Sequence, residues 1–213
     1  MTQARSRTTA KADRAASIKQ SAIEVFAEHG YHNAKVSMIV RRVGVAQGTF
    51  YLYYKSKREI FDEILDDFLT MVTGSVDQWN IGDVDTVDNF RASLIDLGDI
   101  LLQVLVKNQM LTQIFFNEGL AVHPEFAERI RNFYEELEDV MTGINRLNAQ
   151  RNLIRKADYR VLALCTLGMV ERCIQVFIVN PEEPPSVEEL RHIVREIVDF
   201  FIDGAAPQPA PAL

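Results

Sequence analysis

The sequence predicts an all-α protein. Apolar residues recur every three to four positions through most of the 213 residues, whereas the strict alternation expected of β-strands is scarce. Two capping-box sequences, Ser-Lys-Arg-Glu at 56–59 and Ser-Val-Glu-Glu at 186–189, mark helix starts. Gly30, Gly44 and Gly204 follow periodic segments, where helices commonly end. These signals predict about nine helices.

The apolar spacing places each helix in turn. The first is expected over about 13–29, where Ile18, Ala22 and Phe26 recur at every fourth position. Two short helices flank Gly44, and a long one follows the first capping box, with predicted ranges of about 36–43, 46–53 and 56–75. After a joint at 80–85, the remaining helices are expected at about 87–106, 109–120, 124–149, 157–179 and 186–203.

The chain is predicted to divide into four segments. Residues 1–12 are polar and are expected to form a mobile basic arm. Residues 13–56 form a small three-helix unit, and residues 57–204 form a larger helical domain. Residues 205–213 contain three prolines and are expected to be a disordered tail.

Charge is distributed unevenly along the chain. The first sixty residues hold eleven Lys and Arg against four Asp and Glu, although the net charge of the whole chain is −7. A basic amino-terminal segment on an acidic protein suits a polyanionic partner at that end.

Other sequence features bear on the cellular location of the protein and on its disulfide content. No apolar run reaches the ~18 residues of a membrane span, and the N-terminus lacks a signal-peptide core, so we expect a cytoplasmic protein without a membrane partner. The two cysteines, Cys165 and Cys173, make no disulfide framework.

The sequence favours a protein that is not an enzyme. The four histidines are scattered, and none has a second His or Cys at metal-ligand spacing. No nucleophile motif, phosphate-binding loop or dinucleotide fingerprint is present. We therefore expect no metal and no cofactor.

The segment 36–53 has the pattern of a helix-turn-helix motif. Two short helices are joined by a tight turn at Gly44, and Val45 is expected to fill the angle between them. Ile39, Val43 and Phe50 are predicted to face the first helix of the unit. This leaves Gln47, Thr49, Tyr51 and Tyr53 pointing outward from the second helix, and Gly48 lets the backbone approach a groove wall.

The stretch GVAQGTFYLYYKSKREIF at 44–61 resembles the signature of the tetracycline-repressor (TetR) family of transcriptional regulators. The resemblance extends back over residues 14–43, and beyond 61 only the helical layout and length agree. It implies a repressor that binds a palindromic DNA operator as a homodimer, with Tyr54 in the core. The DNA-contacting positions that it implies are Lys35, Ser37, Gln47, Gly48, Thr49, Tyr51, Tyr53, Lys55 and Lys57.

Two positions depart from the family pattern. Lys35 stands where a threonine usually caps the second helix, and lysine cannot accept the free N–H groups, which costs on the order of 1 kcal/mol. Lys35 can reach a phosphate instead, and Ser37 serves either as a cap with a shifted helix start or as a DNA contact. Val40 replaces a common alanine, so tighter packing is expected there.

The resemblance also implies roles for the larger domain. Its last two helices are expected to pair with those of a second copy through Leu164, Gly168, Val194, Ile197 and Phe201. The helices before them are expected to enclose an apolar or amphipathic effector, such as a fatty acyl compound or a flat drug-like molecule. The predicted lining consists of Trp79, Leu101, Leu105, Met110, Ile114, Phe115, Asn117, Phe133, Tyr134 and Met141.

Two alternatives remain open from the sequence. A helical adaptor protein without DNA binding would use the small unit to contact another protein. A redox-sensing regulator would use Cys165 and Cys173, which lie eight residues apart on one predicted helix.

Overall fold

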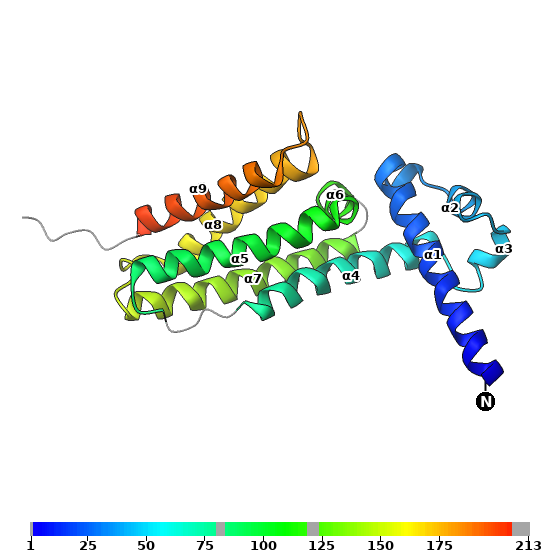
Figure 1. Cartoon of the computed structure of the whole chain (residues 1–213), viewed down its shortest axis with the longest axis horizontal. Coiled ribbons are helices and arrows are strands. Elements are labelled where there is room, and N and C mark those ends of the chain that lie inside the picture. The colour runs from blue at the N-terminus through cyan, green and yellow to red at the C-terminus, as the bar shows by residue number, and fades with distance from the viewer. Residues whose placement is uncertain (1, 80–83, 119–123, 206–213) are drawn as a thin grey trace, which may run out of the picture. The chain divides into compact units, whose positions relative to one another are not determined.

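The structure, a computed structural model, describes residues 2–79, 84–118 and 124–205 (Figure 1). These residues form helices and no strand, which confirms the predicted all-α fold. The elements, in chain order, are α1 (Thr2–Asn33), α2 (Val36–Val43), α3 (Gln47–Phe50), α4 (Lys57–Gln78), α5 (Val87–Lys107), α6 (Gln109–Glu118), α7 (Pro124–Gln150), α8 (Tyr159–Ile174), a π-helical segment (Gln175–Val179) and α9 (Val187–Ala205). Most of the predicted joint at 80–85 and of the predicted tail lies outside the described residues.

The chain forms two compact units. The first comprises Met1–Thr70 and Met110–Ala127, and the second comprises Met71–Gln109 and Glu128–Leu213. The predicted domain boundary at 56/57 differs from this division. The reason is that Ile60, Phe61 and Ile64 of α4 are buried, with at most 1% of each exposed, in the same core as α1.

Local signals explain where most helices begin and end. At α9, Ser186 and Glu189 form a reciprocal capping box, with the Glu189 N–H donating to Ser186 Oγ at 3.2 Å and the Ser186 N–H donating to Glu189 Oε2 at 2.7 Å. At α4, the Glu59 N–H donates to Ser56 Oγ at 3.1 Å, and the Glu59 carboxylate accepts from the Lys55 N–H. Gly44 closes α2 in the left-handed conformation (φ 74°, ψ 35°), as the sequence predicted.

The ends of α1 and α3 differ from prediction. Residues 2–12, expected to be a mobile arm, are helical and continue into α1, because this stretch lacks Gly and Pro and contains Ala, Arg and Lys, which favour helices. Helix α3 is shorter than expected, since residues 51–53 form a turn in which the Leu52 N–H donates to the Thr49 carbonyl at 3.2 Å.

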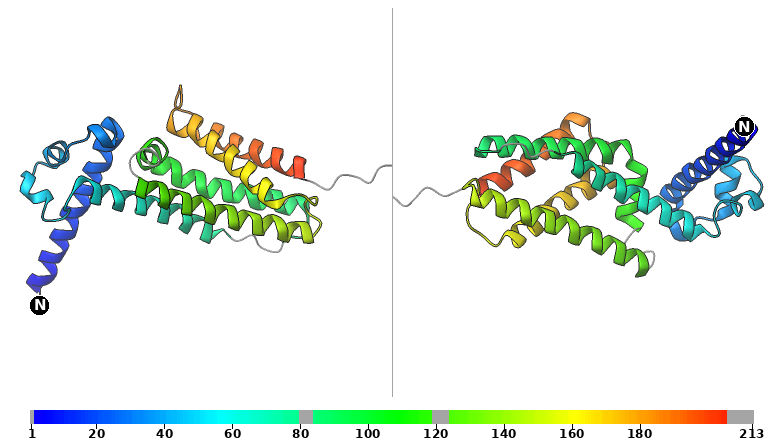
Figure 2. Two further views of the ribbon diagram at one scale, coloured as in Figure 1. Left: turned by 180° about the vertical axis from the view of Figure 1, so that it is seen from behind. Right: turned by 90° about the horizontal axis from the view of Figure 1, so that it is seen from below.

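In the second unit, α8 and α9 cross α5 and α7 obliquely (Figure 2, right). Phe90 of α5 is fully buried, and its ring centroid lies 6.4 Å from that of Phe201 on α9. Arg91 pairs with Asp199 and, at 3.0 Å, with Asp203. A Cβ at Gly98 would overlap the side chain of Val194, so a glycine is needed for α5 and α9 to approach this closely.

Candidate nucleic-acid interface

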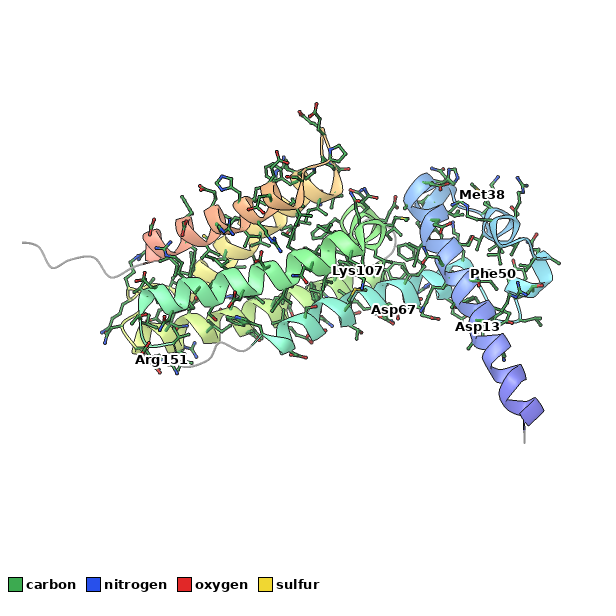
Figure 3. The ribbon with its side chains drawn as sticks, in the orientation of Figure 1. Asp13, Met38, Phe50, Asp67, Lys107 and Arg151 are labelled. Atoms are coloured by element: carbon green, nitrogen blue, oxygen red, sulfur yellow. The ribbon has the colours of Figure 1, made fainter. Side chains whose placement is uncertain are left out.

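A compact apolar core holds the helix-turn-helix segment. Ile18 and Ala22 of α1, Ile39 of α2 and Phe50 of α3 have no exposed surface (Figure 3 labels Phe50). Burying a side chain of the size of Ile or Phe stabilises a fold by roughly 1.5–3 kcal/mol. This core therefore fixes α3 rigidly against α1 and α2.

Val40 is more deeply buried on α2 than Val43. Val43, predicted to face the first helix, is half-buried, whereas Val40 is 5% exposed. Val40 follows Ile39 by one residue and lies beside it on the buried face of α2. The valine that departs from the family alanine therefore occupies a core position.

The side chains around α3 divide into outward and inward groups. Gln47 and Gly48 are exposed, and Thr49 is half-buried. Tyr51 is 52% exposed, whereas Tyr54 is only 5% exposed and packs against Phe50, with 5.7 Å between the ring centroids. Tyr53 is half-buried. The outward prediction thus agrees with the burial of Tyr51, and the core prediction with that of Tyr54.

Lys35 and Ser37 lie at the start of α2. Lys35 is its N-cap, makes no capping hydrogen bond through its side chain, and is exposed. Ser37 lies inside α2 and is half-buried, so the alternative in which it caps a shifted helix is wrong. Lys55, just before α4, is exposed.

Lys57, the first residue of α4, is engaged within the protein. Its Nζ donates to the carbonyls of Tyr31 at 2.5 Å, Ala34 at 2.9 Å and His32 at 3.4 Å. The ammonium group also lies 4.3 Å from the centroid of the Tyr31 ring. The structure therefore gives Lys57 an internal role that sequence reasoning did not foresee.

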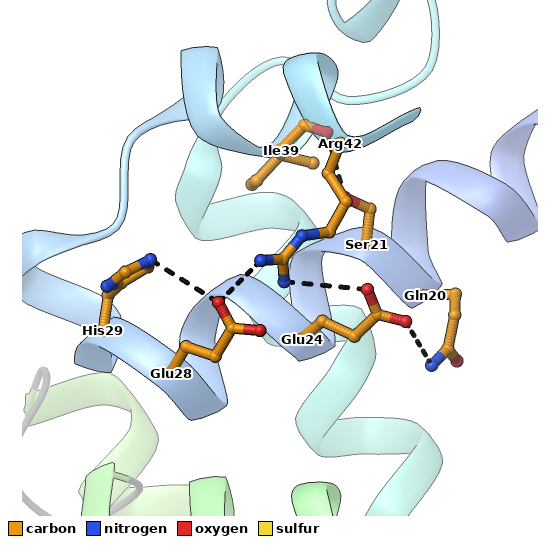
Figure 4. A network of polar contacts seen from close by, with 7 residues as sticks. All are labelled: Gln20, Ser21, Glu24, Glu28, His29, Ile39 and Arg42. Carbon is orange, nitrogen blue, oxygen red and sulfur yellow. Dashed lines mark hydrogen bonds and ion pairs between the residues drawn. The ribbon is translucent and has the colours of Figure 1, made fainter. Parts of the chain in front are cut away.

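Arg42 is likewise paired inside the small unit (Figure 4). Its guanidinium group lies 2.6 Å from the Glu28 carboxylate and 3.6 Å from that of Glu24, both on α1. The hydrogen bond from Arg42 lowers the pKa of Glu28. Buried Ser21 of α1 donates to the carbonyl of Ile39 at 2.9 Å, which adds a second link to α2. The positive charge counted from the sequence is thus partly neutralised by neighbours.

A third polar cluster links α1 to α4. Lys19 Nζ lies 2.9 Å from Glu63 and 2.5 Å from Asp67. Burial raises the pKa of Tyr54 to about 12, with further contributions from the Glu63 charge and a hydrogen bond to Glu63. The Tyr54 hydroxyl therefore joins the end of the helix-turn-helix segment to α4.

Tyr54 and Tyr51 are expected to respond oppositely to removal of the hydroxyl. Tyr54→Phe should lower the free energy of unfolding by about 1 kcal/mol, because it removes one partly buried hydrogen bond, and should change DNA affinity less than twofold. Tyr51→Phe should leave stability unchanged and weaken DNA binding, since its exposed hydroxyl is the predicted phosphate donor. Urea denaturation and duplex titration measure the two effects, and matching behaviour of the two variants would refute the assignment.

The predicted effector-lining residues fall in both compact units. Met110, Ile114, Phe115 and Asn117 belong to the first unit, where Ile114 and Phe115 are buried, and Met110 and Asn117 are exposed. The other six belong to the second unit: Trp79, Leu101, Leu105, Phe133, Tyr134 and Met141.

Within the second unit, polar contacts fix two of these side chains. Trp79 Nε1 donates to the Ser93 carbonyl at 2.8 Å. Burial and Glu171 raise the pKa of Tyr134, whose hydroxyl hydrogen-bonds to that carboxylate. The effector site as a whole stays a prediction.

The predicted pairing surface is partly wrong. Phe201 is 8% exposed and lies in the core of the second unit, and Val194 packs against Gly98 of the same chain. Leu164 is 47% exposed, and Gly168 is exposed, with enough open space that a Cβ added there would meet no atom within 4 Å. Ile197 is half-buried. The sequence-based prediction missed Phe200, which is 70% exposed.

The cysteines do not form a bond within one chain. Cys165 is exposed and Cys173 is half-buried, and both lie on α8. Eight residues of helix span ~12 Å, whereas a disulfide requires Cα atoms within about 7 Å. An intramolecular redox switch through this pair is therefore excluded.

Comparison with known proteins identifies the small unit. Residues 18–64 match the family model described as bacterial regulatory proteins, tetR family, and this range covers α2, α3 and most of the core just described. The small unit belongs to the TetR family of transcriptional regulators. Its helix-turn-helix segment is accordingly a DNA-binding element.

Relatives of this TetR-family chain match along nearly its full length. It is 25% identical over 189 residues to the HTH-type transcriptional regulator YdgC of Bacillus subtilis, covering 89% of this chain and 91% of the relative. It is 24% identical over 188 residues to the fatty acid metabolism regulator protein of the same organism, covering 88% and 93%.

Solved structures show the same fold. FadR from Bacillus subtilis in complex with stearoyl-CoA aligns with a TM-score of 0.68 at 22% identity, covering 88% of this chain and 97% of that one. PfmR from Thermus thermophilus aligns with a TM-score of 0.70 at 17% identity, covering 90% and 99%. The fold of a TetR-family regulator therefore extends through both compact units.

Proposed function

We propose that this TetR-family regulator is a repressor that binds a palindromic operator as a homodimer and is released by a fatty acyl or similar amphipathic effector. The single observation that carries the dimer is the exposure of apolar residues on both α8 and α9. The four exposed residues Val161, Leu164, Gly168 and Phe200 are called the α8/α9 face below. Val161, Leu164 and Phe200 are 51%, 47% and 70% exposed.

The α8/α9 face is suited to a second copy of the chain. Val161, Leu164 and Gly168 are spaced by three and four residues, so they line one side of α8. Within the described residues, Tyr159–Val179 is the stretch with the length and mean hydropathy (1.8) of a membrane-crossing helix, and only 11% of the residues in its apolar 18-residue window are fully buried inside the protomer. So much exposed apolar surface calls for a covering partner.

The two-fold symmetry of the proposed operator follows from a homodimer that carries two DNA-binding elements. One short recognition helix contacts few base pairs, and two heads read half-sites about 34–36 Å apart on the duplex. Gln47 and Thr49 are the proposed base-reading side chains, because both lie on α3, where Gln47 is exposed and Thr49 is half-buried. A good bidentate contact discriminates between bases by about 1–3 kcal/mol.

The effector class is supported by the fatty-acid regulators among the similar proteins. A relative from Bacillus subtilis is named a fatty acid metabolism regulator, and the structure of FadR from that organism holds stearoyl-CoA. The aromatic and aliphatic residues of α5 to α7 in this chain suit an acyl chain, although the sequence also allows a flat drug-like molecule. Release requires the effector to favour the conformation that does not bind DNA, because a ligand shifts an equilibrium only through differential affinity.

Contacts inside the first unit offer a route for that signal. Phe115 of α6 packs on Phe68 of α4 with 4.8 Å between centroids, and Phe126 of α7 packs on Phe61 at 5.1 Å. The Glu118 carboxylate of α6 lies 2.8 Å from where a Cβ of Gly30 would stand. These contacts connect α6 and the start of α7 to the helices that hold α3.

The proposed location of the protein is the cytoplasm.

The proposal is tested by selecting binding sites from random duplexes and titrating the selected operator with acyl-CoA. We expect an inverted repeat, dimer binding, and at least tenfold weaker DNA affinity at saturating stearoyl-CoA. Coenzyme A alone and free stearate are the control ligands, since they separate recognition of the acyl chain from that of the nucleotide. Selected sites without two-fold symmetry would refute the dimeric arrangement, and release by neither acyl compound would refute the effector class.

A further inference from the structure

We infer that Lys57 is a positioning residue of the DNA-binding unit, whose ammonium group holds the corner between α1 and α2 and does not bind a DNA phosphate. This inference rests on the DNA-binding function and refines it. Lys57 is half-buried at the first position of α4, and the corner that it contacts is the segment Gly30–Lys35.

The ammonium group of Lys57 has no donor left for a phosphate. A lysine ammonium carries three N–H bonds. Three backbone carbonyls accept from it, those of Tyr31 at 2.5 Å, Ala34 at 2.9 Å and His32 at 3.4 Å. A phosphate contact would therefore have to break an existing hydrogen bond.

Two effects of opposite sign act on the charge of Lys57: burial lowers the pKa of its ammonium group, whereas the carbonyl oxygens that accept its hydrogen bonds favour the charged form. The carbonyl oxygens of Tyr31 and His32, which follow the break in α1 at Gly30, point their partial negative charges at the ammonium group. The face of the Tyr31 ring, 4.3 Å away, adds a cation–π contact. Withdrawal of the side chain would leave these carbonyls without their partner, at a corner where Ala34 is only 2% exposed.

The corner depends on Lys57 because little else there stabilises the backbone. Lys35 stands at the N-cap of α2 and makes no side-chain capping bond. Gly30 leaves the helical conformation at φ 73° and ψ 158°, so the backbone of α1 is already broken there. Lys57 thus connects α4 to the point from which α2 starts. Helix α2 packs on α3, so the corner sets the position of the recognition residues.

Lys55 provides a matched comparison two residues away. It has the same charge and is exposed, and among the described residues no hydrogen bond or ion pair of its side chain is seen. The sequence predicts Lys55 as a DNA contact. The two lysines therefore differ in whether their ammonium groups are already occupied.

The salt dependence of operator binding separates the two roles. Each lost phosphate contact reduces the slope of log K against log salt by about 0.9, or about 1.8 for a dimer with two heads. Lys55→Met should reduce the slope by about that amount and leave the melting temperature unchanged. Lys57→Met should weaken binding about tenfold at every salt concentration, with an unchanged slope and a melting temperature lower by several degrees.

A slope reduction for Lys57→Met equal to that of Lys55→Met would overturn the inference, as would unchanged melting temperature and affinity. If Lys57→Met does not fold, side-chain ¹⁵N NMR of the wild-type complex decides instead. The Lys57 ammonium signal should then keep its position on operator binding, whereas a coupling to ³¹P would overturn the inference. Wild-type protein that does not bind the selected operator would refute the proposed function, and the melting temperature of Lys57→Met, expected to fall by several degrees, would then test the role of Lys57 at the corner by itself.

Discussion

Leu164→Arg is expected to convert the protein from a dimer into a monomer. The substitution places a charge in the centre of the α8/α9 face, where two copies would bury it without a partner, at a cost of several kcal/mol. Loss of the dimer should weaken operator binding at least 100-fold, or about 2.8 kcal/mol, because one head alone reads a single half-site. Analytical ultracentrifugation and duplex titration on the same samples measure both effects.

Val140→Arg is the matched control for the dimer experiment. Val140 lies on α7 and is 48% exposed, nearly the same as Leu164, but it lies outside the α8/α9 face. This variant should stay dimeric and retain operator affinity. If Leu164→Arg stays dimeric, the α8/α9 face is not the interface, and binding of the wild-type protein to lipid vesicles would then identify a membrane as its partner.

The α8/α9 face also shows where sequence reasoning about packing fails. Phe200 and Phe201 are adjacent and equally apolar, and the helical stripe of α9 favours Phe201 together with Val194 and Ile197. That stripe packs within the chain, because Phe201 meets Phe90 of α5. Periodicity identifies the more apolar side of a helix, but it does not say whether that side faces its own chain or another copy.

Elements fixed by local chemistry were predictable. The capping box at Ser186 and the left-handed Gly44 both depend on residues within four positions, so their structure follows from short sequence patterns. The inward orientation of Phe50 and Tyr54 followed from the helix-turn-helix pattern and the family resemblance.

The partners of charged side chains were not predictable from the same patterns. Lys57 contacts carbonyls 23 to 26 residues earlier in the chain, and Arg42 pairs with Glu28 across two helices. Both contacts depend on how helices pack in three dimensions, which hydrophobic spacing alone does not specify. A count of cations in the basic segment therefore overstates how many face DNA.

Phe61→Ala is expected to be strongly destabilising. Phe61 has no exposed surface, and its ring centroid lies 4.5 Å from that of Tyr31, 5.4 Å from Phe26 and 5.1 Å from Phe126. Truncation of such a buried ring removes its packing and leaves a cavity, which costs about 3–5 kcal/mol. Urea denaturation should show this loss as a lower transition midpoint.

The position of Phe61 makes the effect more than a local loss of packing. Its ring contacts α1, where Tyr31 supplies one of the carbonyls that hold Lys57, and it contacts the start of α7 through Phe126. Phe61→Leu should retain most of the stability, with a loss of about 1–1.5 kcal/mol. Leu52→Ala is the control, because Leu52 is 74% exposed and should change stability by less than about 0.5 kcal/mol. A loss for Phe61→Ala no larger than that of Leu52→Ala would contradict the central place of this ring in the core that supports α3.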